Sequence, residues 1–347
     1  MPRHCIGLDI GTNSVKAVQL KETGKGFHLL SFGIEPLPAE TIVDGAIMNQ
    51  SAVVDAIKTL RNLLGFKGRD VATAVSGHSV IVKKLKIPQM TKEELDQHIP
   101  WEAEQHIPFS KEEVEMDHQI LGSQDGQMEV VLVAAKKEVL SDYSLAIREA
   151  KLSPSVLDVT AFTIQNAFEV NYTLEPGETV ALINVGATMS TINILSQGTS
   201  AFTRDVAGGG KDFTEEIQKR LNVGQDEAEA WKIGGTSEGE VLPHEVEAVI
   251  AEVAEGMAGK LQRSLDFFLQ TSTDAKLSRI YLSGGTARIP ALQRALAQKS
   301  AAEVQILDPF RRIIVDEKKF DTNFLAVHAA QAAVAVGLAL RHSGDKA

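Results

Sequence analysis

The sequence Asp9-Ile10-Gly11-Thr12-Asn13 separates two apolar runs of the chain, and Asn184-Val185-Gly186-Ala187-Thr188 separates two more. The two stretches align at a constant offset of 175 residues (184 − 9), which is about half of the 347-residue chain. In each, a predicted strand ends in a carboxylate or an amide, and a glycine then opens a tight turn into a second strand. Because glycine has no Cβ, its backbone N–H groups can turn toward an anion. The repeat therefore predicts two related lobes, each with a hairpin suited to phosphate.

Two further glycine motifs lie in the second half of the chain. Leu282-Ser283-Gly284-Gly285-Thr286 joins a predicted strand at 279–283 to a helix that begins near Ile289. The first N–H groups of such a helix can face a phosphate or a base. Gly208-Gly209-Gly210 precedes a predicted helix at 212–221 and would let the backbone approach a bound nucleotide, although a flexible loop is the alternative reading.

The composition limits the classes of partner. The chain has 35 Lys and Arg residues against 46 Asp and Glu residues, a net charge of −11, and this balance argues against nucleic-acid binding. Its single cysteine, Cys5, excludes an internal disulfide and a cysteine-rich zinc site. The first residues lack a signal-peptide core, and the alanine-rich stretch 325–340 predicts a buried helix rather than a membrane span. We expect a soluble, cytosolic protein.

The order of predicted strands and helices indicates an α/β protein of two lobes with an insertion. We expect a first lobe at 1–87 and 153–176, completed by a C-terminal helix at 324–341. The segment 88–152 opens with the capping-box sequence Thr91-Lys92-Glu93-Glu94 and reads as a small inserted α/β subdomain. The second lobe is expected at 177–323, with a helical part at 212–274.

The glycine motifs resemble those of the actin-like ATPase superfamily, whose fold is built from duplicated ribonuclease-H-like lobes. Asp9 to Thr12 with Lys16 is similar to the first phosphate loop of that superfamily, 184–188 to the second, and 282–286 to its adenosine motif. Glu229-Ala230-Trp231-Lys232 resembles a stretch of the FtsA-like branch whose Glu and Lys face the nucleoside. The resemblance implies ATP and Mg²⁺ as ligands.

The resemblance also implies roles for individual residues. Asp9 and Asn184 would hold the water shell of Mg²⁺, with Asp9 as the metal residue, and Lys16 would place its charge on the phosphates. The catalytic candidates are Asp9, Asn184 and Gln165. The expected nucleotide contacts come from the hairpins, the glycine turns and the helix near 230: Gly11, Thr12, Asn13, Lys16, Gly186, Ala187, Thr188, Gly208, Gly209, Glu229, Lys232, Gly284, Gly285, Thr286 and Arg288.

One position departs from the superfamily pattern. The second phosphate loop normally begins with aspartate, whereas this chain has Asn184. An amide can still accept a hydrogen bond from Mg²⁺-bound water, but it carries no charge and cannot act as a base. Orientation of a water molecule would then depend on Gln165 or Asn166. We expect nucleotide binding with slow or absent hydrolysis, so enzymatic activity is left open.

The expected insertion narrows the resemblance to the PilM family of type IV pilus proteins. Its helix end 102–109, the acidic stretch 113–117 and the strand exit 131–136 are similar to that family. The resemblance implies a cytoplasmic, ATP-binding adaptor of the inner-membrane pilus platform that binds the N-terminal cytoplasmic peptide of PilN. Other platform proteins and motor ATPases are further implied partners, and the membrane would be reached only through them.

The residues leave three other interpretations. The first alternative is a filament-forming cytoskeletal or cell-division ATPase of the FtsA or MreB type, and the second is a small-molecule kinase of the same fold. The third is a metal site on one helix face at His98, Glu102 and His106. Pro100 interrupts that helix pattern, and the two histidines are separated by more than two turns, so a metal site there is disfavoured.

Overall fold

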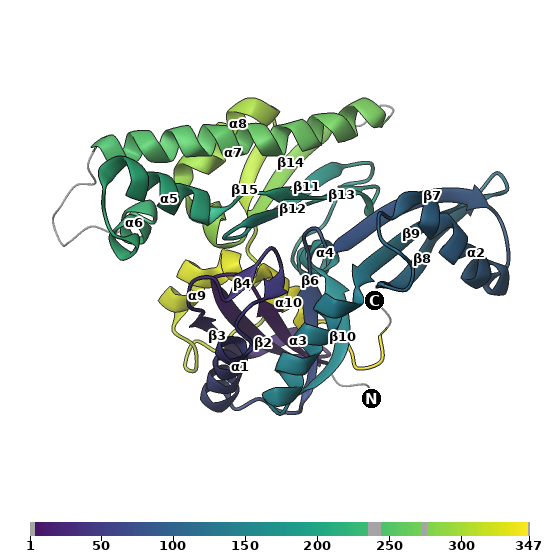
Figure 1. Ribbon diagram of the computed structural model, residues 1–347, viewed down its shortest axis with the longest axis horizontal. Helices are drawn as coiled ribbons and strands as arrows, with labels where there is room; N and C mark the ends of the chain where they lie inside the picture. The colour runs from purple at the N-terminus through teal and green to yellow at the C-terminus, as the bar shows by residue number, and fades with distance from the viewer. Residues whose placement is uncertain (1–3, 235–243, 273–275, 346–347) are drawn as a thin grey trace.

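A computed structural model describes residues 4–234, 244–272 and 276–345. Two five-stranded sheets form the centres of two lobes, and a smaller three-stranded sheet projects from the first lobe (Figure 1). The two large sheets have the same order: three antiparallel strands followed by two parallel ones. The predicted duplicated α/β architecture is therefore confirmed.

The first sheet has the order β10-β6-β1-β2-β3. β1 and β2 form the antiparallel hairpin that carries the first glycine motif, with Asp9 paired to Lys16. The sheet continues from β2 to β3 on one side and from β1 through parallel β6 to β10 on the other. Its strands are β1 (Ile6–Ile10), β2 (Ser14–Thr23), β3 (Gly26–Pro36), β6 (Asp70–Val75) and β10 (Ser153–Val159).

The second sheet repeats this pattern in the order β13-β12-β11-β14-β15. β11 and β12 form the hairpin of the second glycine motif, and β14 runs parallel to β11 into the Gly284-Gly285 turn. β11 thus corresponds to β1, and β12 to β2. The strands are β11 (Thr179–Val185), β12 (Met189–Ser196), β13 (Thr199–Ala207), β14 (Leu277–Ser283) and β15 (Glu303–Ile306).

Helices cover these sheets and supply the walls of the space between the lobes. In the second lobe, the long α7 packs against α5 and α8 and crosses the top of the molecule (Figure 1). The predicted helix at 212–221 agrees with α5 to within two residues, and α6 and α7 lie within the predicted helical part at 212–274. The second-lobe helices are α5 (Gly210–Leu221), α6 (Gln225–Lys232), α7 (His244–Thr271), the short 3₁₀ helix η1 (Gly285–Arg288) and α8 (Pro290–Ser300).

The C-terminal helices close the first lobe. α10 packs against α4 and β1, and every residue of α10 is buried. The two helices approach so closely that a Cβ on Gly337 would lie 1.8 Å from the carbonyl oxygen of Thr163. The segment Thr322–Ala339 has the length and composition of a membrane span, but 56% of it is buried inside the fold. The first-lobe helices are α1 (Gln50–Leu64), α3 (Lys137–Glu149), α4 (Thr160–Asn171), α9 (Thr322–His328), η2 (Ala329–Ala332) and α10 (Ala333–Ala339). A short ribbon of β4 (Ile42–Val43) and β5 (Ala46–Ile47) precedes α1.

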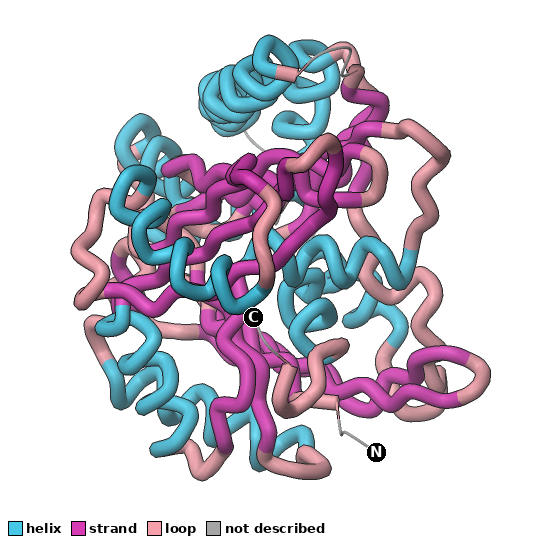
Figure 2. Tube along the Cα trace, turned by 90° about the vertical axis from the view of Figure 1, so that its right-hand side faces the viewer, coloured by secondary structure: helices cyan, strands magenta, loops and turns pink. Residues whose placement is uncertain are grey.

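The projecting part has a sheet and a core of its own. Its three antiparallel strands have the order β7-β9-β8, and α2 packs its buried Leu95, Ile99 and Ala103 onto one face. Thr91 and Glu94 form the predicted capping box at the start of α2. Figure 2 views the molecule from the side of this projection. The elements are β7 (Val80–Pro88), α2 (Lys92–His106), β8 (Val114–Gln124) and β9 (Gln127–Lys136).

The packing differs from the expected insertion at 88–152 at both ends. β7 already belongs to the three-stranded sheet and begins at Val80. α3 follows the insertion in sequence, but its buried Val139, Tyr143 and Ile147 join the core of the first lobe. An amphipathic pattern predicts that a helix buries one face without identifying the core that receives it. The domain boundaries stay a prediction, and this packing favours 80–136 for the insertion.

Candidate functional site

A cavity of about 1190 Å³ lies between the two lobes. Both glycine hairpins line it, together with the Gly284-Gly285 turn, α6 and the start of α5. Its volume is somewhat above the usual range for small-molecule sites, about 300–1,000 Å³. Segments that are far apart in the sequence therefore converge on one concave site, as the motifs predicted.

The two hairpins have the same backbone geometry and contact each other across the cavity. The N–H of Gly11 donates to the carbonyl of Ser14 at 3.2 Å, and the N–H of Gly186 donates to that of Met189 at 2.9 Å. The hydroxyl oxygens of Thr12 and Thr188 are 3.1 Å apart. The lobes thus meet at the tips of the hairpins, so a ligand in the cavity beside this contact would reach both hairpins.

The first hairpin carries opposite charges at its mouth. Lys16 Nζ lies 3.2 Å from Asp9 Oδ2 and 3.3 Å from the carbonyl oxygen of Ser14, to which it donates. Both side chains are mostly buried but still reach the cavity. Antiparallel pairing of β1 with β2 places these two residues opposite each other, so the hairpin register fixes the charge pair.

The second hairpin is neutral and is held by the adjacent turn. Asn184 Oδ1 accepts a hydrogen bond of 3.2 Å from the hydroxyl of Ser283 at the end of β14. Gly284 follows with φ of 87°, and a Cβ there would lie 2.3 Å from the carbonyl oxygen of Val185. Both the backbone conformation and the close approach thus require glycine at this position.

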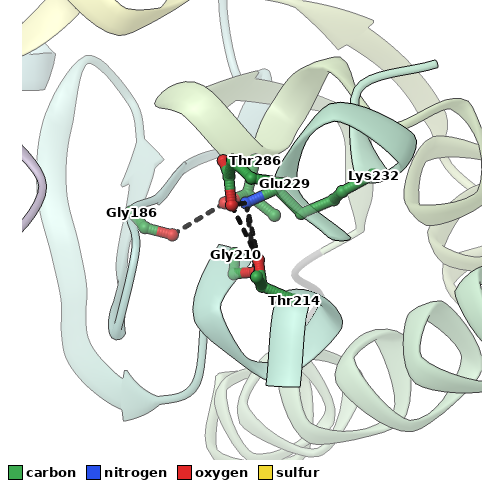
Figure 3. A network of polar contacts seen from close by, with 6 residues as sticks. All are labelled: Gly186, Gly210, Thr214, Glu229, Lys232 and Thr286. Carbon is green, nitrogen blue, oxygen red and sulfur yellow. Dashed lines mark hydrogen bonds and ion pairs between the residues drawn. The ribbon is translucent and has the colours of Figure 1, made fainter. Parts of the chain in front are cut away.

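A polar network joins the second hairpin to α5 and α6 (Figure 3). Lys232 Nζ donates to Glu229 Oε2 at 2.6 Å, to the hydroxyl of Thr214 at 3.1 Å and to the carbonyl of Gly210 at 3.3 Å. Thr286 donates to the carbonyl of Gly186 at 2.7 Å. Lys232 is only 10% exposed, so its buried charge needs hydrogen-bond acceptors, and these three groups supply them. The Glu229–Lys232 pair predicted to face a nucleoside therefore lies at the cavity wall.

Most predicted contact residues line the cavity, but three predicted residues do not. Gly208 donates to the carbonyl of Thr188 at 2.9 Å and supports the hairpin from behind. Gly209 passes so close that a Cβ would lie 2.4 Å from the carbonyl oxygen of Gly186. The cavity-lining members of the predicted set are Asp9, Gly11, Thr12, Asn13, Lys16, Asn184, Gly186, Ala187, Thr188, Glu229, Lys232, Gly284, Gly285, Thr286 and Arg288.

The third is Gln165, which does not line the cavity. Its amide donates to Glu169 Oε1 at 2.8 Å and accepts from Asn193 Nδ2 at 3.3 Å, so it is engaged outside the cavity. α4 begins at Thr160, which does line the cavity. Gln165 follows five residues later, about 140° further around the helix, and so lies on another face.

Several cavity residues were not predicted from the sequence. Thr214, Arg294 and Gln331 line the cavity, as does His328 from α9. Burial, with a smaller contribution from the nearby Arg288, lowers the pKa of His328. Among these residues only Thr214 has a sequence signal, its spacing of four residues from Gly210. His328 approaches the cavity only through folding of the C-terminal segment onto the first lobe.

The repeated sheet order and the facing glycine hairpins define an actin-like ATPase fold. The projecting insertion then distinguishes members within that class. The family model of the type IV pilus assembly protein PilM matches residues 7–343. The chain therefore belongs to the PilM family.

Solved structures agree with this assignment. The chain resembles a chain of a PilM–PilN type IV pilus biogenesis complex, with 28% identity, 98% and 99% of the two chains covered and a TM-score of 0.88. The ethanolamine utilization protein EutJ of Carboxydothermus hydrogenoformans shares the fold at 15% identity, with coverage of 98% and 90% and a TM-score of 0.59. ADP-bound MreB5 of Spiroplasma citri shares it at 14% identity, with coverage of 96% and 94% and a TM-score of 0.51.

A curated relative is also similar in sequence. The cell division protein FtsA of Bacillus subtilis is 21% identical over 257 residues, which cover 65% of this chain. The match spans only 57% of the FtsA sequence. The likeness therefore stops short of the full length of that relative.

Proposed function

We propose that this chain is a nucleotide-responsive adaptor in type IV pilus assembly, which binds ATP with Mg²⁺ between its lobes. The single observation that carries the proposal is the pair of glycine hairpins facing each other across the cavity, with 3.1 Å between Thr12 and Thr188. A triphosphate bound in the cavity beside this contact would accept hydrogen bonds from both hairpins and thus stabilise closure of the lobes.

The residues at the first hairpin fit a magnesium nucleotide. Mg²⁺ favours oxygen ligands and retains much of its water, so Asp9 and the amide oxygen of Asn184 would hold that water shell. Lys16, now beside Asp9, would turn its charge to the phosphates. Glu229 and Lys232 would face the nucleoside. Bound Mg²⁺ would neutralise phosphate charge.

Slow or absent hydrolysis is part of the proposal. The amide of Asn184 cannot accept a proton from an attacking water, and Gln165 is engaged with Glu169 and Asn193 outside the cavity. Both observations support a chain that uses ATP as a bound ligand more than as a substrate. ATP-dependent filaments seen by electron microscopy would instead favour the alternative of an FtsA-like or MreB-like protein.

The proposed partner is the N-terminal cytoplasmic peptide of PilN, with other platform proteins and motor ATPases beyond it. The support is membership of the PilM family and the likeness to a chain of the PilM–PilN complex. Through such partners a cytoplasmic chain would be located at the inner membrane.

A contact between the second lobe and the insertion offers a route for the nucleotide response. Asp205 on β13 accepts from the N–H of Gly77 at 2.5 Å and from the hydroxyl of Thr191 at 2.6 Å. Gly77 lies between β6 and β7, where the chain enters the insertion, and Thr191 lies on β12 of the second hairpin, opposite Asn184. Lobe closure would therefore move the base of the insertion.

Calorimetry with Mg-ATP and then with a PilN-type peptide tests the proposal. The variant Asp9→Ala should weaken Mg-ATP binding about 10- to 100-fold, because it removes a charged partner of the bound magnesium. Asp55→Ala, a control at an exposed carboxylate on α1, should bind as the unmodified chain does. Equal Mg-ATP affinity in Asp9→Ala would refute the nucleotide site, and equal peptide affinity with ATP, ADP or neither would refute the switch.

A further inference from the structure

A cluster of two histidines and a glutamate lies outside the nucleotide cavity, where the two ends of the described chain meet. His4 precedes β1, Glu22 lies near the end of β2, and His342 follows α10. One possible ligand atom from each residue lies within 4.8 Å of the other two. Among the described residues, this is the group of imidazole and carboxylate side chains that converges closely enough to hold a metal ion.

The backbone brings these three residues together. β1 pairs with β2, so the start of β1 lies beside the end of β2 where Glu22 stands. His4 forms an antiparallel bridge with His342, and the N–H of Cys5 donates to the carbonyl of Arg341 at 2.8 Å. The positions are thus set by pairing of extended segments, which holds side chains more exactly than a loop does.

The side chains converge and leave one nitrogen without a described partner. His4 Nε2 lies 3.3 Å from Glu22 Oε2, and the rings of His4 and His342 have centroids 4.0 Å apart. His4 is 11% exposed, and among the described residues its buried Nδ1 has no hydrogen-bond partner. The two imidazole rings and the carboxylate therefore approach one another closely enough for one ion to contact all three.

We propose that His4, Glu22 and His342 form a binding site for Zn²⁺. Two imidazoles and a carboxylate are a typical zinc ligand set, with metal–ligand distances of about 2.0–2.2 Å. Magnesium prefers oxygen ligands throughout, so this site differs in kind from the one at Asp9. Glu22 is 61% exposed and opens the cluster to solvent, which gives the ion an entry path.

The carboxylate of Asp345 lies beside His342. Its Oδ2 lies 3.8 Å from Nδ1 of His342 and accepts from the backbone N–H of the same residue at 2.8 Å. The same oxygen lies 3.3 Å from Arg341 Nε. Held there, the carboxylate can orient the His342 ring, as carboxylates beside metal-bound histidines do. Bound zinc would connect the chain before β1 to the chain after α10.

Zinc titration of chelator-treated full-length protein tests the site. Calorimetry should show one Zn²⁺ bound per chain, and Glu22→Gln and His342→Asn should each weaken it at least about tenfold. Co²⁺ is a second probe, because its absorption reports nitrogen and oxygen ligation directly, and this signal should be lost in the same variants. The matched control is His106→Asn on α2, where His98, Glu102 and His106 offer the same groups in a row.

Each result decides for or against the site. The proposal is supported if zinc raises the Tm of the unmodified chain and of His106→Asn but not of the two site variants. It is overturned if no stoichiometric zinc binds, if both site variants bind zinc as the unmodified chain does, or if the α2 variant alone loses it. Circular dichroism of the zinc-free variants separates loss of a ligand from loss of the fold.

Discussion

The two hairpins of the cleft share a backbone and differ in charge. The hairpin of the first lobe presents Asp9 and Lys16 as an ion pair, whereas the second presents the amide of Asn184. At the position equivalent to Lys16, the second lobe has Thr191, which donates to Asp205 near the base of the insertion. Duplication thus preserved the shape of the phosphate loop in both lobes. Its charged groups remain in the first lobe, and the second lobe connects to the insertion.

The second hairpin also depends on packing in a way that the first does not. A Cβ added to Gly209 would lie 2.4 Å from the carbonyl oxygen of Gly186. A Cβ added to Gly11 would meet the Lys16 Nζ at 3.0 Å, and the end of a flexible side chain can move away. One lobe therefore positions its loop by charge pairing, and the other by the close approach of two backbones.

The largest expected effect comes from breaking that backbone contact. Gly209→Ala should lower the free energy of unfolding by about 1–3 kcal/mol, because the added methyl group cannot be accommodated without moving the second hairpin. Denaturant unfolding measures the change. Gly24→Ala is the control, since a Cβ there meets nothing within 4 Å, and it should change stability by less than about 0.5 kcal/mol. Similar losses in the two variants would contradict a packing role for Gly209.

A smaller effect is expected from making the two hairpins alike in charge. Asn184→Asp supplies a carboxylate that can accept a proton, so ATP hydrolysis should rise about tenfold above its slow basal rate. Phosphate release under saturating Mg-ATP measures it. Asn166→Asp adds the same charge on α4 outside the cavity and should leave the rate unchanged. An unchanged rate in Asn184→Asp would show that this amide is not what limits hydrolysis.

The smallest effect concerns a contact between the lobes. His328 comes from the C-terminal segment of the first lobe, and Arg288 comes from the second. Burial, and to a lesser extent Arg288, lowers the pKa of His328, so the unfolded chain takes up this proton more readily than the folded one. Stability should therefore fall as pH drops below about 6.5, the usual histidine value. In His328→Gln the loss of Tm from pH 7 to pH 5 should be smaller, by on the order of 1 °C. If the Tm of His328→Gln fell with pH as the Tm of the unmodified chain does, His328 would not be the group responsible.

Local signals in the sequence were sufficient to find the fold and most of the cleft. Each glycine motif lies at a strand end. The half-chain offset between the motifs at 9–13 and 184–188 predicted two lobes with duplicated sheets. The position of Gln165 relative to the cavity could not be predicted, because no motif fixed where α4 begins. Once Thr160 is known to be the first residue of that helix, the direction of Gln165 away from the cavity follows from the helical repeat.

Features that depend on pairing between distant segments were not predictable in the same way. Val80 to Leu85 reads as a strand, but nothing local shows that β7 pairs with β9 and so belongs to the insertion. The convergence of His4 with His342 likewise depends on a bridge between segments that are 338 residues apart (342 − 4). Hydrophobic patterning specifies which face of an element is buried and leaves its partner undetermined.

The packing of α10 against β1 has a consequence for the order of folding during synthesis. A Cβ on Gly7 would lie 2.0 Å from the carbonyl oxygen of Ala335, so the first strand of the chain is covered by its last helix. Until the ribosome has released residues 333–339, the first lobe lacks that cover. The insertion and the second lobe have their own cores and can form earlier. The strand β1 is thus made more than 300 residues before the helix α10 that covers it (333 − 10 = 323).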